Sequence, residues 1–332
     1  MKPACALLGI VAAGLVFAAG QTSAWTDVAT PDGSAETAAI APGAPAAAPE
    51  APRFDQAEVV RQQRERLEGI KKELQVVLRA GESDHFLLFS DLQTQVRDAI
   101  LVWLEDLRKK VITTLSVDPQ ERFWDGKCLV LVFERQESLQ AFAEKFDDHH
   151  VPRPRGYFVL EARRSDGPRL VHIATFQPLK GGNEALREVL VHETTHAIIE
   201  MCGKSGTLPL WVHEGLAEYM TCAMDPSLRP RKQKHAYEAA SATPYESIQD
   251  VLTGSFPPSD LRSYSVSMGL IECLLKIDAD GVLKFVEALK DGMPPHEALA
   301  QAYLGLDYEG LERRWKDYVL RAYRPPSQDV RP

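Results

Sequence analysis

The pair His192 and His196, four positions apart in a largely apolar segment, constrains this chain more than any other feature. The apolar residues around the pair, from Leu186 to Ile199, predict a buried helix that Asn183 begins as its N-cap and Gly203 ends. Residues four positions apart share one helical face, so both imidazole rings can reach a single ion. The alternative is an exposed helix that carries two histidines by chance. The apolar neighbours argue against exposure, and buried histidines without a partner would be costly.

Glu193 follows the first histidine and completes the sequence His-Glu-Thr-Thr-His, an HExxH pattern. One step along a helix turns its carboxylate away from the ligand position, so it lies beside the metal rather than on it. From there it can take a proton from a metal-bound water. We therefore predict a hydrolytic metal site with Glu193 as its general base.

A catalytic zinc ion needs a third protein ligand and a fourth position that stays open to water. Glu214, 18 positions after His196, is the candidate for the third ligand. The segment from Gly203 to Pro209 permits a loop and an antiparallel helix that brings Glu214 back over His196. Glu218 lies one turn further along, where it can accept a hydrogen bond from a ligand histidine. His213 points about 100° away from Glu214 around the helix and is predicted not to be a ligand.

Together the two segments resemble a known family. The second segment runs from Trp211 to Tyr219 and has the pattern W-x-x-E-G-x-A-x-Y. With HExxH, this pattern resembles the gluzincins, the superfamily of thermolysin and of the aminopeptidase N type, and looks closest to bacterial exported proteins called peptidase-MA-like. The resemblance implies one zinc ion per chain. It also implies that His192, His196 and Glu214 bind the zinc ion and that Glu193 is the general base. Glu218 would accept a hydrogen bond from a ligand histidine.

The resemblance also bears on how a substrate is held. Aminopeptidases of the superfamily bind a free amine with G-x-M-E-N, and the nearest sequence here, Gly156–Leu160, does not match, so we predict an endopeptidase. Family members stabilise the oxyanion with a Tyr or a His from their C-terminal helices. Tyr264 is the first candidate and His235 the second, while a purely packing role for Tyr264 stays open. The strand Leu170–Phe176 is expected at a sheet edge, where a peptide can add as an extra strand.

The segments before the histidine pair predict an α+β fold, with a small mixed sheet and helices packed on it. Apolar runs predict four strands, at His85–Phe89, Cys128–Phe133, Gly156–Ala162 and Leu170–Phe176, the last two joined by a turn at Ser165–Gly167. Helical spacing predicts helices over about residues 55–80, ended by Gly81, and over Val96–Val111 and Glu137–Phe146. The HExxH helix, the antiparallel helix with Glu214 and a mostly helical C-terminal part complete the expected gluzincin-like architecture.

The two ends of the chain are expected to lie outside this fold. Lys2, an apolar run from Ala6 to Ala19 and small residues up to Ala24 are typical of a signal peptide over residues 1–24, with an uncleaved anchor as the alternative. Residues 25–53 are rich in Ala and Pro and predict a disordered linker. We assign residues 54–183 to the N-terminal helix and sheet part of the catalytic domain, 184–325 to the zinc-site helices and C-terminal helical part, and 326–332 to a tail.

Charge and location limit the partners of the protein. The signal peptide predicts an exported bacterial protein, periplasmic or secreted, without membrane contact beyond that segment. The formal net charge of −9 argues against a nucleic-acid partner, because phosphate binding needs clustered basic residues. The cluster formed by Arg229, Arg231, Lys232 and Lys234 is short and is expected to be solvated. His149 and His150 are likewise expected in a surface loop.

Four cysteines follow the expected signal peptide, and an oxidising compartment permits disulfides. Cys202 and Cys222 follow the second histidine and the predicted glutamate ligand by six and eight residues. Antiparallel helices carry them in opposite directions, which places their sulfur atoms about 20 Å apart, too far for a bond. We predict that they are not bonded to each other, so a disulfide of Cys222 would have to use Cys128 or Cys273.

The sequence favours a zinc-dependent metallopeptidase that hydrolyses peptides or proteins with a zinc-bound water activated by Glu193. A zinc hydrolase of non-peptide substrates is one alternative, since its metal chemistry would be the same. A catalytically silent, peptidase-like binding or scaffold protein is another. The presence of Glu193 argues against silence, because inactive forms usually lose the base or a ligand.

Overall fold

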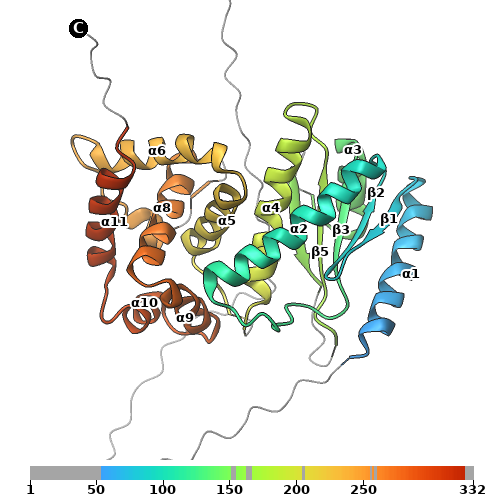
Figure 1. The fold of residues 1–332 in the computed structure, drawn as a ribbon, viewed down its shortest axis with the longest axis horizontal. Helices are drawn as coiled ribbons and strands as arrows, with labels where there is room; N and C mark the ends of the chain where they lie inside the picture. The colour runs from blue at the N-terminus through green and yellow to red at the C-terminus, as the bar shows by residue number, and fades with distance from the viewer. Residues whose placement is uncertain are drawn as a thin grey trace, which may run out of the picture.

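The computed structural model describes residues 54–150, 155–161, 167–203, 206–254, 256–257 and 260–325. The expected signal peptide, the linker over 25–53, the tail and most of the turn at Ser165–Gly167 lie outside these residues. Across the part that is described, none of the helices has the length and apolar character needed to cross a membrane. Figure 1 shows a sheet with its own helices on one side of the molecule and the C-terminal helices on the other, with α4 and α5 between them.

The sheet has five strands in the order β1-β2-β3-β5-β4. They span Arg79–Glu82 (β1), Phe86–Ser90 (β2), Cys128–Phe133 (β3), Gly156–Leu160 (β4) and Val171–Phe176 (β5). Strands β2, β3 and β5 are parallel, while β1 and β4 pair antiparallel at the two edges. Every residue of β2 and β3 is buried, which is why both strands consist of apolar residues except for Ser90 at the end of β2. The expected small mixed sheet is confirmed.

The position of β5 corrects one expectation. The strand before the HExxH helix was expected at a sheet edge, but β5 lies between β3 and β4. The hairpin places β4 outside, so β5 is free to pair in parallel with β3. Five of the six residues of β5 are buried, whereas β4 becomes exposed toward Leu160. A peptide that extends the sheet on this side would therefore pair with β4.

The three N-terminal helices cover both faces of the sheet. They span Gln56–Leu74 (α1), Thr94–Leu115 (α2) and Gln136–Phe146 (α3). Side chains on one face, such as Leu88 and Val130, pack with α2 and α4, and those on the other, such as Leu87 and Leu129, pack with α1 and α3. The first helix is shorter than expected. Gln75 has the left-handed φ of 53° that ends it, and the last two residues of the expected helix, together with Gly81 that was expected to end it, belong to β1 instead.

The C-terminal part is helical, as expected. Its α-helices span Gly182–Met201 (α4), Leu210–Met224 (α5), Arg229–Ser241 (α6), Gln249–Thr253 (α7), Leu261–Ile277 (α8), Ala279–Lys290 (α9), Pro295–Ala302 (α10) and Tyr308–Ala322 (α11). Helices α5 and α8 approach closely at Gly215, where an added Cβ would lie 2.5 Å from the backbone oxygen of Ser267. Glycine is required there, and the contact fixes the helix that carries Glu214.

His172 is the centre of a buried polar cluster that includes residues near both ends of β4, Tyr157 and Glu161. His172 of β5 is 2% exposed, and its ring nitrogens lie 3.0 Å from Asp147 and 3.5 Å from Glu161. The hydroxyl of Tyr157 also donates to Asp147, at 2.7 Å. The expectation that His149 is a surface residue is wrong: it is buried and its ring stacks on Tyr157 at 4.4 Å between centroids.

The charge of His172 is expected to contribute to stability in a pH-dependent way. Burial lowers its pKa, but hydrogen bonds to Asp147 and Glu161 outweigh burial and hold the pKa above its ordinary value of 6.5. The charged form is therefore favoured by folding. This contribution is fully present below the unfolded pKa and is lost as pH rises through the raised folded pKa.

We expect the difference in free energy of unfolding between wild type and His172→Gln to shrink as pH is raised from about 6 to 9. Chemical denaturation across this range measures it, with exposed His150→Gln as the control. A difference that stays constant or grows with pH would contradict a charged His172.

Candidate metal centre

Helix α4 positions the two histidines and is buried along most of its length. It begins two residues earlier than expected, because Gly181, with a φ of 84°, is the N-cap in place of Asn183. The side chain of Asn183 instead accepts a hydrogen bond from Gln177. The helix ends at Met201, and Gly203 follows with a left-handed φ of 65°, in agreement with its predicted role.

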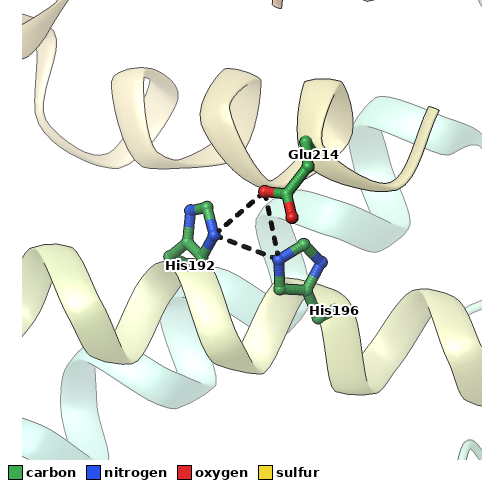
Figure 2. A group of neighbouring side chains, drawn as sticks. All are labelled: His192, His196 and Glu214. Carbon is green, nitrogen blue, oxygen red and sulfur yellow. Dashed lines mark hydrogen bonds and ion pairs between the residues drawn. The ribbon is translucent and has the colours of Figure 1, made fainter. Parts of the chain in front are cut away.

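Three of the predicted residues converge on one point. The Nε2 atoms of His192 and His196 lie 3.0 Å apart, and Oε2 of Glu214 lies 3.3 Å and 3.6 Å from them. Figure 2 shows Glu214 on one helix facing both histidines on the other. Each residue offers a ligand atom within 4.8 Å of the others, so the group could hold a metal ion.

The residues present fit a divalent cation such as zinc. Both carboxylate oxygens of Glu214 are buried and have no hydrogen-bond partner among the described residues. Burial raises its pKa, but the two histidines outweigh burial and hold the pKa far below its usual range, so the carboxylate is ionised. Two imidazole nitrogens that face each other beside a buried carboxylate form the donor set of catalytic zinc sites. An ion bound there would satisfy all three.

Glu193 lies beside this group rather than within it. It is 4% exposed and borders the same pocket as His192. Burial raises its pKa to about 7, against the lowering effect of His192 and Arg155. A carboxylate with a pKa near neutrality suits a general base. The structure therefore places Glu193 where the sequence predicts it, although its role remains a prediction.

Glu218 connects His192 to a third helix. Its Oε1 atom lies 3.6 Å from Nδ1 of His192, and its other oxygen forms an ion pair with Lys232 of α6. The expectation of a solvated basic cluster is wrong for Lys232, which is buried, and for Arg229, which pairs with Glu272. A signal for Lys232 was present in the sequence, since Ala236 and Ala239 share its helical face and are buried with it.

We expect Glu218→Ala to weaken metal affinity by about 10- to 100-fold, because it removes the carboxylate that orients His192. Competition with a chromophoric chelator measures this affinity, and exposed Glu238→Ala serves as the control. A loss as complete as that of Glu214→Ala would mean that Glu218 is the ligand.

His213 packs against the metal group by stacking on one of its histidines. The ring of His213 stacks on that of His196, with centroids 4.1 Å apart and planes 6° apart. His213 Nε2 lies 3.2 Å from Glu200, which also pairs with Lys290 of α9. His213 lies outside the group that could hold a metal, as predicted. Its ring holds the orientation of His196, a role that sequence spacing did not indicate.

Both candidates for the oxyanion donor border the same pocket. Tyr264 of α8 and His235 of α6 line it together with His192, Glu193 and Glu218. Tyr264 is 7% exposed, so packing contributes to its position. The structure brings these residues together without distinguishing which of the two donates.

The cysteine prediction is confirmed. All four cysteines of the described residues are free and buried: Cys128, Cys202, Cys222 and Cys273. Cys202 and Cys222 are therefore not bonded to each other. The alternative pairings of Cys222 do not occur either.

Residues 179–321 match the family model described as Peptidase MA superfamily. The match extends from just before α4 into α11 and thus includes every residue of the candidate site except Arg155. No curated protein matches the chain. The family match supports a protein of the gluzincin-type peptidase superfamily. It indicates that the protein is a hydrolase, namely a metal-dependent peptidase.

Proposed function

We propose that the protein is an exported zinc endopeptidase with one zinc ion per chain, held by His192, His196 and Glu214. The observation that carries this proposal is the convergence of three ligand atoms, one of them from a buried carboxylate whose oxygens accept no hydrogen bond among the described residues. The family match over the same helices supports peptide substrates.

The chemistry divides among few groups. When bound, zinc supplies Lewis-acid polarisation and lowers the pKa of a coordinated water. Glu193 takes a proton from the attacking water and passes it to the leaving amine. Tyr264, or His235 in its place, donates a hydrogen bond to the oxyanion as it develops. Glu218, held by Lys232, keeps His192 in the orientation that binding requires.

The edge strand β4 suits an extended substrate. It packs against α4, and the ring of Phe158 lies 5.8 Å from that of His196 between centroids. A peptide that pairs with β4 gains main-chain hydrogen bonds with little dependence on its sequence. This mode of binding, together with the missing G-x-M-E-N motif, favours cleavage within a chain over removal of an N-terminal residue.

The test is a cleavage screen with the purified, zinc-loaded chain on a proteome-derived peptide library, with Glu193→Gln as the matched control. Internal cuts that require Glu193 are expected. Cuts only at N-terminal residues would exclude an endopeptidase. A loaded chain that cuts no peptide would favour a non-peptide substrate or a silent binding protein.

A further inference from the structure

The pocket beside the metal group is lined by charged side chains of both signs. Its lining includes three cationic and three anionic side chains: Arg155, Arg231, Lys232, Glu188, Glu193 and Glu218. The cations come from the segment before β4 and from α6, and the anions from α4 and α5. Which charges already have partners decides what the pocket can bind.

Pairing within the pocket is incomplete. Lys232 is neutralised by Glu218, and both are buried. In the described ranges of the chain, Arg155 and Arg231 form no ion pair. Other basic side chains of α6, the helix of Arg231, do form one, such as Arg229 with Glu272. Arg155 is half-buried and lines the pocket together with Glu193, the proposed base.

We propose that Arg155 and Arg231 form a carboxylate-binding subsite, and that the preferred substrates are peptides that carry a carboxylate near the scissile bond. This rests on the proposed function and deepens it. A guanidinium group presents paired N–H donors that match the two oxygens of a carboxylate. Glu188 and Glu193 would repel such a ligand, but the two arginines line the same pocket, and a bound metal ion would add its positive charge to theirs.

Two sources offer this chemistry, a free peptide C-terminus and an Asp or Glu side chain. Random hexapeptide mixtures are therefore made in four forms, with the C-terminus as acid or amide and with acidic residues present or replaced by Asn and Gln. The protein is the full chain with Glu193→Gln, isolated with its metal bound. Binding is measured as the amount of each peptide form that this protein retains. Any contact between a carboxylate and the metal is common to all variants in this background.

Retention of carboxylate-bearing peptides over their amide counterparts is expected to be about 10- to 100-fold, as for charge-assisted hydrogen bonds. Arg155→Gln and Arg231→Gln should each reduce this ratio, and the double variant should reduce it furthest, to the part that any contact with the metal supplies. Arg313→Gln on α11, an exposed arginine outside the pocket, should leave it unchanged. The form that is enriched identifies the source. No enrichment, or the same enrichment in the double variant, overturns the subsite.

Cleavage by the wild-type chain separates the two proposals. If peptides are cut with equal kcat/KM in acid and amide forms, the subsite is wrong and the endopeptidase stands. If nothing is cut but retention still depends on both arginines, the peptidase is wrong and the carboxylate site stands. Both arginines are at least partly exposed, so the single variants are expected to fold.

Discussion

Glu214→Ala is expected to lower the metal content from about one zinc per chain to less than about one tenth. The variant removes one of three ligands and the only anionic one, so the remaining histidine pair must hold the cation without charge compensation. His196→Ala should act in the same direction. Mass spectrometry of the protein after gel filtration measures the bound metal.

Glu309→Ala, an exposed glutamate on α11, is the matched control and should keep its zinc. Thermal unfolding of the metal-free proteins shows whether the fold survives. Retention of a full zinc equivalent by a folded Glu214→Ala protein would remove Glu214 from the ligand set.

Glu193→Gln is expected to lower kcat/KM by about 10²- to 10⁴-fold while zinc content stays unchanged. The amide keeps the size of the side chain and cannot accept the proton of the attacking water. Since Glu193 lies outside the group of converging ligand atoms, its neutralisation leaves that group intact. Initial rates on a peptide from the cleavage screen give the first value, and metal analysis of the same sample gives the second.

Glu184→Gln, in the exposed first turn of α4, serves as the control for this helix. A Glu193→Gln protein that lost its zinc would show that Glu193 binds the metal, and the base would have to be sought elsewhere.

Features with a strong local signal could be predicted from the sequence. Strand β3 was predicted at its observed ends, because a short continuous run of six apolar residues is typical of a strand that is buried on both faces of a sheet. His192 and His196 converge because residues four positions apart lie on the same face of a helix. Glu214 could be placed because the loop before α5 is short enough to force a return.

Features that depend on tertiary pairing could not be predicted in the same way. Strand β1 reads Arg-Ala-Gly-Glu, without apolar alternation, and forms because β2 offers a partner. A hairpin can place either of its strands outside, so the order of β4 and β5 was beyond the sequence. The spacing of Lys232 from Ala236 and Ala239 indicates a buried face of α6, but the sequence does not show that Glu218 is the residue with which Lys232 pairs there.

The rate at which the four buried cysteines are alkylated can report on local unfolding of the protein. Burial raises the pKa of each thiol, to about 12 for Cys202 and about 11 for Cys222 and Cys273, and further still for Cys128. Alkylating reagents attack the thiolate, so the native fold hides these groups both sterically and chemically. Labelling at each cysteine therefore proceeds only as fast as its surroundings open. Cys128 reports on the sheet, Cys202 and Cys222 on the ends of the helices that bring the metal ligands together, and Cys273 on α8.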